Sequence, residues 1–104
     1  MKRGEAWWAE QPEPIGSRPV LLLSRDEAYE VRNAVTIAQI TTTIRNIPVE
    51  VPLDDKDGLP QKCVANLDTL TTIRKAILTK RICSLSSQKM EQIDKAIKFA
   101  LALE

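Results

Sequence analysis

The chain has 104 residues, of which 43% are hydrophobic and 28% are charged, and its formal net charge at pH 7 is +1. These values exclude a disordered chain and predict one globular domain over residues 1–104. No apolar run is long enough for a membrane span, and the basic start lacks the apolar segment of a signal peptide, so we expect a cytoplasmic protein without membrane association. A core this small stabilises a monomer only marginally, and a dimer is therefore expected.

The N-terminal half of the sequence predicts short strands separated by turns. Residues 6–9 form a β-prone run, which a proline-rich loop follows. The continuous aliphatic run at residues 19–24 is typical of a buried strand. Residues 25–32 are polar and predict an excursion or a short helix. Residues 34–43 are rich in β-branched side chains and predict the next strand.

The C-terminal half continues with strands, and then the spacing of its apolar residues changes to that of a helix. Two prolines make residues 47–53 a candidate edge strand, and the Asp-, Gly- and Pro-rich residues 54–61 predict a loop. Residues 63–73 and 77–85 supply two or three further strands. After Ser86, a plausible helix N-cap, apolar residues recur at helical spacing to the end of the chain. We therefore expect a mainly β domain, a small twisted barrel or sheet, with a C-terminal amphipathic helix packed on it.

The side chains present exclude several kinds of catalysis. The chain has no histidine, which removes the commonest general base and metal ligand. Its two cysteines, Cys63 and Cys83, are far apart and read as buried small hydrophobes, so no metal site is expected. Three glycines cannot build a glycine-rich phosphate loop. Any catalysis must use Arg, Lys, Thr, Ser, Asp or Glu, without an evident cofactor.

RNA cleavage suits this set of side chains. RNA carries its own nucleophile, the 2′-hydroxyl, so an enzyme needs only to align it and to stabilise the charge on the phosphorane. A fixed guanidinium gives planar, bidentate donors to phosphate oxygens. The sequence places Arg18 before Pro19 at the mouth of one strand and Thr41 near the end of another. The alternation of side chains does not show whether the two meet.

Each candidate has an ordinary structural alternative. Arg18 could pair with an acidic neighbour such as Asp26, and Thr41 could serve strand propensity alone. Trp7 and Trp8 could stack on bases, although core packing for one and a dimer contact for the other is the favoured interpretation. A basic stretch could contact phosphates or form a solvated surface. Its members are Lys62, Arg74, Lys75, Lys80 and Arg81.

Four blocks of the sequence read KRGEAWWAE, GSRPVLLLSRD, a strand ending in AQIT, and LTKRICSLSSQKMEQIDKAIKFALAL. Their sequences and their order, which extend over nearly the whole chain, resemble the MazF/PemK/Kid family of toxin endoribonucleases. The resemblance implies a small SH3-like β-barrel with short helices that works as a homodimer. It also implies metal-independent, sequence-preferring cleavage of single-stranded RNA, usually mRNA, and neutralisation by a cognate antitoxin. A non-cutting member that binds RNA or antitoxin, and an SH3-like interaction module, are the alternative functions.

The resemblance also assigns residues. The family's catalytic arginine maps onto Arg18 and its catalytic threonine onto Thr41, with Thr42 and Thr43 as rivals for that position. Two departures, a short loop before Arg18 and the sequence of residues 68–74, separate this chain from many relatives and leave its base preference open. We expect RNA contacts from six further residues: Ser17, Pro19, Gln39, Thr42, Asp68 and Thr69.

Overall fold

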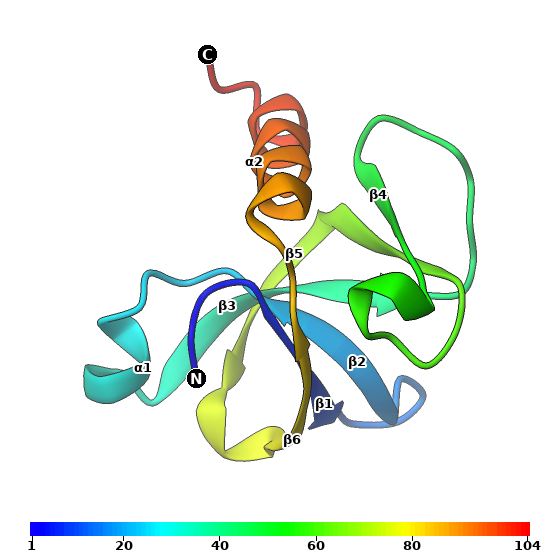
Figure 1. Ribbon diagram of the computed structural model, residues 1–104. Helices are drawn as coiled ribbons and strands as arrows, with labels where there is room; N and C mark the ends of the chain where they lie inside the picture. Colours follow the sequence, from blue (N-terminus) through cyan, green and yellow to red (C-terminus); the bar gives the residue numbers. More distant parts are fainter.

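The computed structural model describes residues 1–104, which form one antiparallel sheet, two α-helices and two short 3-10 turns (Figure 1). The strands are β1 (Glu5–Glu10), β2 (Ser17–Leu22), β3 (Ala34–Thr41), β4 (Glu50–Leu53), β5 (Cys63–Arg74) and β6 (Leu78–Ser84). The helices are α1 (Ala28–Val31) and α2 (Ser87–Ala100), and the 3-10 turns are η1 (Asp55–Asp57) and η2 (Lys75–Ile77). No helix is long and apolar enough to cross a membrane.

The sheet has the strand order β4-β5-β3-β2-β1-β6 and is strongly curled. Much of the curl comes from β5, where Ala38 of β3 lies opposite Leu70 but the next residue, Gln39, lies opposite Asn66. Residues 67–69 of β5 therefore have no partner on β3, and such bulges bend a strand and increase its twist. The register of β1 against β6 shifts as well. The predicted mainly β, barrel-like fold with a C-terminal helix is confirmed.

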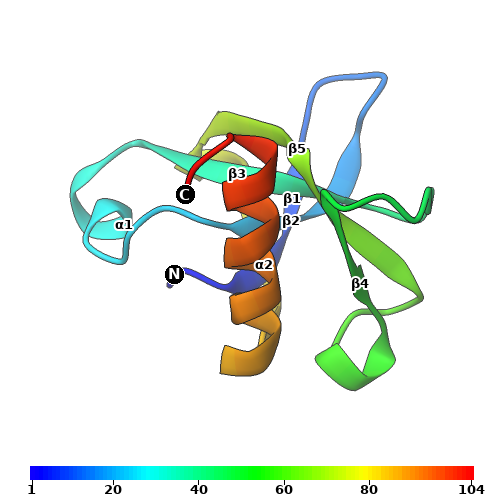
Figure 2. The same ribbon diagram turned by 90° about the horizontal axis from the view of Figure 1, so that it is seen from above.

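The two faces of the sheet bury two separate apolar clusters. One contains Leu21, Ile40 and Leu67 and is covered by α2, whose Ile93 is fully buried and which packs against β5 and β4 (Figure 2). The other contains Val20, Leu22 and Ile37 and is covered by Tyr29 of α1. Because β2 faces both clusters, Val20, Leu21 and Leu22 are all apolar and buried, as the continuous run in the sequence predicted.

Most predicted elements are confirmed, and their ends have local causes. The strand expected to reach residue 43 ends at Thr41, because the Thr43 backbone N–H donates to Thr41 Oγ1 at 3.1 Å and the chain leaves the ladder. The expected edge strand does lie at the sheet edge but begins only at Glu50. Ser86 caps α2 as predicted and accepts a bond from the Lys89 backbone N–H at 3.1 Å. Cys63 and Cys83 are both free thiols.

The segment before β1 ties distant elements together. The Gly4 backbone N–H donates to the Leu22 carbonyl at 2.8 Å, and the Gly4 carbonyl accepts from the Leu85 N–H at 2.9 Å. Arg3 donates to Asp94 of α2 at 2.8 Å. The N-terminal block KRGE therefore fastens α2 to the sheet rather than entering a reactive site.

Gly58 should be the least replaceable glycine. Its φ is +104°, and a Cβ there would lie 2.5 Å from Cys83 Cβ, whereas Gly16, with φ +69°, meets only the Glu13 carboxylate at 3.5 Å or beyond. Both G58A and G16A incur a left-handed backbone cost of about 1–2 kcal/mol, and G58A adds about 1–3 kcal/mol of overpacking. Urea unfolding should show G58A as clearly the less stable variant. Equal stabilities of the two variants would contradict this packing.

Candidate active site

Arg18 and Thr41 come from neighbouring strands and lie at the same end of the sheet. The last aligned pair of β2 and β3 is Val20 opposite Gln39. Continuing that antiparallel register by two residues sets Arg18 across from Thr41, and alternation puts both on the face shared with Val20. Beyond the last pair the strands no longer bond to each other, and the gap opens into pockets. The structure thus brings together the two residues whose meeting the sequence left open.

Two adjacent pockets share Arg18, Ile40 and Thr41 as a common wall. The first has a volume of about 390 Å³, the second about 340 Å³. The rest of the first pocket is lined by Trp8, Ser17, Pro19, Thr42, Leu59, Pro60, Gln61 and Cys63. The rest of the second is lined by Pro14, Ile15 and Gln39. Arg18 is the one charged side chain in either lining, so both pockets are suited to an anion at their shared wall.

The Arg18 side chain is exposed and anchored at one end. Its Nε donates to the Ile15 carbonyl at 3.1 Å, which fixes the guanidinium against the β1–β2 loop. It forms no salt bridge, and neither terminal nitrogen has a hydrogen-bond partner in the protein. The alternative pairing with Asp26 is wrong, because Asp26 accepts instead from the Arg3 backbone N–H at 2.7 Å. Arg18 therefore presents free donors to the pockets.

Thr41 differs from the two threonines that follow it. Its Oγ1 accepts from the Thr43 backbone N–H, which leaves the hydroxyl proton free to be donated. Thr41 is half-buried and lines both pockets, Thr42 is exposed and lines the first one only, and Thr43 lines neither. Among the three candidates, Thr41 is thus the hydroxyl on the wall shared with Arg18.

The predicted RNA-contact residues divide into three places. Ser17, Pro19 and Thr42 line the first pocket, and Gln39 lines the second. Asp68 and Thr69 lie on the unpaired bulge of β5 and line neither pocket.

Thr69 nevertheless supports the site indirectly, through a contact with β3. Its hydroxyl donates to the Asn66 carbonyl at 2.7 Å and accepts from the Gln39 backbone N–H at 3.3 Å. The bulge therefore holds the middle of β3 in place, next to the strand end that carries Thr41.

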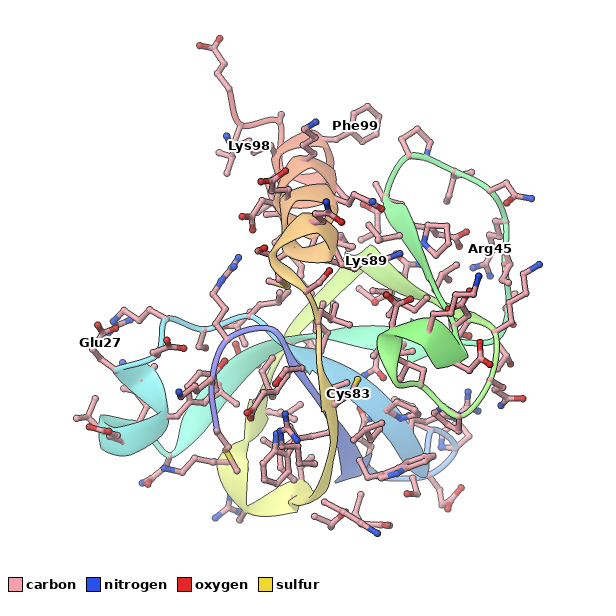
Figure 3. The ribbon with its side chains drawn as sticks, in the orientation of Figure 1. Glu27, Arg45, Cys83, Lys89, Lys98 and Phe99 are labelled. Carbon is pink, nitrogen blue, oxygen red and sulfur yellow. The ribbon has the colours of Figure 1, made fainter.

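A buried carboxylate anchors the loop that follows Thr41. The Glu50 side chain is 1% exposed, and its Oε1 accepts from the backbone N–H groups of Arg45 and Asn46 at 2.8 and 3.0 Å. Its Oε2 has no hydrogen bond, and the Arg45 guanidinium lies 3.8 Å away. Figure 3 shows Arg45 on this loop, on the side of the molecule opposite Glu27 and α1. Sequence pattern alone does not reveal this anchor, because Glu50 looks there like an ordinary polar residue of an edge strand.

The two tryptophans and the cysteine near the site differ in where they lie and what they contact. Trp8 lines the first pocket, whereas Trp7 packs against the second apolar cluster and its Nε1 donates to Glu5 at 3.0 Å. Burial, helped by the negative charges of Asp57 and Asp54, raises the pKa of Cys63 to about 11. The Cys63 thiol in the first pocket is therefore neutral at physiological pH and is a weak nucleophile.

Sequence reasoning missed part of both linings. Leu59, Pro60 and Gln61 come from the loop after η1, far along the chain from Arg18, and in the sequence they belong only to the predicted loop at residues 54–61. The basic stretch lines neither pocket. Two of its members have structural partners instead, since Arg81 pairs with Glu5 at 3.1 Å and Lys75 donates to the Tyr29 carbonyl at 2.6 Å. No cluster of three or more His, Cys, Asp or Glu side chains is arranged to hold a metal ion.

Comparisons with known proteins agree in sequence and in structure. The chain is 39% identical over 100 residues to the probable endoribonuclease MazF5 of Mycobacterium tuberculosis, covering 95% of this chain and 91% of the relative. It is 32% identical to the endoribonuclease EndoA of Bacillus subtilis, covering 99% and 96%. The solved M. tuberculosis toxin MazF-mt6 superposes with a TM-score of 0.89 at 33% identity, covering 96% of this chain and 98% of that one.

Another solved structure and a family model also match this chain. A mycobacterial endoribonuclease in complex with its cognate antitoxin superposes with a TM-score of 0.88 at 27% identity, covering 100% of this chain and 97% of that one. Residues 2–101 match the family model described as PemK-like, MazF-like toxin of type II toxin-antitoxin system. The resemblance drawn from the sequence is confirmed: this chain belongs to the PemK-like, MazF-like toxins of type II toxin–antitoxin systems.

Proposed function

We propose that the chain is an endoribonuclease toxin that cuts single-stranded RNA, mRNA in particular, with a sequence preference and without a metal. The observation that carries the proposal is the common wall of the two pockets, where an unpaired guanidinium stands beside a free hydroxyl proton. The relatives named endoribonucleases support the same activity. A chain placed along the two pockets would set one phosphate at Arg18 and Thr41 and its flanking nucleotides on either side.

In the proposed reaction the 2′-oxygen attacks the adjacent phosphorus. The O2′–P bond forms and the P–O5′ bond breaks, while the 2′-hydroxyl loses its proton and the departing O5′ gains one. The products are a 2′,3′-cyclic phosphate and a 5′-hydroxyl end. Arg18 stabilises the extra negative charge of the phosphorane, and Thr41 donates a hydrogen bond to one of its oxygens. Such preorganised donors act most strongly on the transition state, where the charge is greatest.

We also propose the setting in which this activity is used. By analogy with the mycobacterial endoribonuclease solved with its cognate antitoxin, an antitoxin binds this chain and blocks the site. We place the protein in the cytoplasm, where mRNA is available, and propose that two copies pair so that their pockets form one RNA groove. The exposed apolar side chain of Ile15, in the lining of the second pocket, supplies surface for such a contact.

Cleavage should depend on the Arg18 guanidinium. Purified protein incubated with a long single-stranded RNA in EDTA should give discrete fragments, and R18A should give none. R18K keeps the charge but loses the planar pair of donors, so it should remain far below the wild type. R25A, which removes an exposed arginine outside both pockets, is the matched control and should cut normally. Intact RNA at micromolar folded wild-type protein would exclude the nuclease, and a band shift without cutting would assign RNA binding instead.

The Thr41 hydroxyl should contribute one transition-state donor. T41A should lower the cleavage rate by about 10²-fold, with the thermal unfolding midpoint little changed, and T41S should retain most of the rate. T42A and T43A are the comparison variants, since neither residue lies on the shared wall. A normal rate in T41A together with a loss in T42A or T43A would move the role to that neighbour.

The proposed groove requires a dimer. Sedimentation equilibrium at micromolar concentration should give twice the mass of one chain. A monomer mass over the concentration range in which RNA is cut would show that one copy suffices and would remove the groove from the proposal.

A further inference from the structure

The loop that joins Thr41 to β4 is tied to the protein by side chains rather than by backbone pairing. Residues 42–46 of this loop are exposed or half-buried, and none of their backbone groups bonds to another backbone group. The N–H groups of this segment form hydrogen bonds to two side chains only, to the Thr41 hydroxyl at its start and to the Glu50 carboxylate beyond its end. The conformation of the loop therefore depends on one hydroxyl and one carboxylate.

Glu50 holds the far end of this segment from inside the protein. Its side chain is 1% exposed, and its Oε1 accepts from the N–H groups of Arg45 and Asn46 at 2.8 and 3.0 Å. Asn46 has φ +57°, a left-handed conformation in which successive N–H groups converge on one anion. A charged acceptor forms stronger bonds to them than a neutral one does. The sheet fixes the carboxylate in turn, because Glu50 is the first residue of β4 and pairs with Asn66 of β5.

The second oxygen of the carboxylate makes this anchor costly. Glu50 Oε2 is buried without a hydrogen bond, and the Arg45 guanidinium, whose side chain is 58% exposed, lies 3.8 Å away. Removing one partner of a buried charge is strongly unfavourable, whereas an apolar side chain of similar volume avoids the cost of burying the charge at all. A carboxylate at this position is therefore explained by the loop that it holds and not by its packing.

The near end of the segment orients the reactive hydroxyl. The Thr43 N–H donates to Thr41 Oγ1 at 3.1 Å, which orients that oxygen and leaves its proton to be donated. A single residue, Ile44, separates Thr43 from the part of the loop that Glu50 holds. The anchor and the oriented hydroxyl are thus connected by a very short stretch of backbone.

We propose that Glu50 is a positioning residue of the reactive site, whose carboxylate fixes the loop so that the Thr43 N–H keeps the Thr41 hydroxyl directed at the scissile phosphate. This role rests on the proposed endoribonuclease function, in which the Thr41 hydroxyl donates to the phosphorane. A donor that is already oriented needs no reorganisation when the negative charge develops. Without the anchor the hydroxyl takes other orientations as well, and the rate falls. The loss has an upper limit, which is the contribution of Thr41 itself.

Single-turnover cleavage of one RNA at saturating protein tests this coupling in E50L, E50Q, T41A and the double variant E50L/T41A. E50L removes both carboxylate oxygens and should lower the rate constant by about tenfold or more, up to the roughly 10²-fold loss expected of T41A. E50Q keeps one acceptor oxygen for the two N–H groups and should restore part of the rate. E50L/T41A should cleave within about twofold of T41A alone, because no hydroxyl is left to position.

I93V is the control for a loss of stability without a change at the site. It removes a methyl group from a fully buried side chain of α2, outside both pockets, so it should unfold more easily but cut at the wild-type rate. A wild-type rate in folded E50L would overturn the positioning role while the nuclease itself stands. So would losses in E50L and T41A that multiply in the double variant.

Amide hydrogen exchange gives a second test that needs no cleavage and no apolar variant. E50Q retains the size and polarity of the side chain but replaces the charged acceptor by a neutral one. The N–H groups of Thr43, Arg45 and Asn46 should therefore exchange at least about threefold faster in E50Q than in the wild type, and the amides in the middle of β3 should be unaffected. Unchanged exchange at Thr43 would refute the coupling even if the wild type cut no RNA, a result that by itself would count against the proposed function.

Discussion

The antiparallel register of β2 and β3 is the constraint on which the rest of the site depends. Side chains alternate along a strand, so a slip of one residue would send Arg18 and Thr41 to opposite faces of the sheet. Val20, Leu22 and Ile37 favour the register because in it they fill the same apolar cluster together. The pairing of β2 with β3 ends at Val20 and Gln39. The residues beyond it, Arg18 and Thr41, form the wall that the two pockets share. Core packing thus sets the geometry of the proposed chemistry.

Around this wall the chain leaves one positive charge without a partner. Four other cationic side chains form ion pairs, with Asp94, Glu50, Glu5 and Asp57, whereas Arg18 bonds only to the Ile15 carbonyl. Because Arg18 is exposed, water solvates its guanidinium, and leaving that charge unpaired costs little free energy. A phosphate can bind it without breaking an ion pair. The Gln11–Gln39 pair ties the β1–β2 loop to β3, and the buried Glu50 side chain holds the loop after Thr41. The site therefore combines a rigid backbone with a guanidinium that has no ion-pair partner.

The sequence predicts the strands and helices of this fold well, but it predicts only some of the contacts between them. The aliphatic run after Pro19, the β-branched run up to Thr41 and the helical period after Ser86 each depend on local pattern, and the structure contains all three. The pairing of Arg18 with Thr41 depends on register, which local pattern leaves open. The β5 bulge at residues 67–69, the reciprocal bonding of Gln11 with Gln39 and the arrival of Pro60 at the first pocket are contacts between distant segments. No period or spacing in a single sequence encodes them.

The central claim, that Arg18 and Thr41 act together on one phosphate, is tested most directly by a double-mutant cycle on the cleavage rate. R18K, T41A and the combined variant would be compared with the wild type on one RNA at saturating protein. Residues that act as a unit on one transition state are strongly non-additive, so the combined variant should lose at least about tenfold less than the product of the single losses. Single losses that multiply within experimental error would show that the two side chains act independently and would contradict the shared wall as one reactive site.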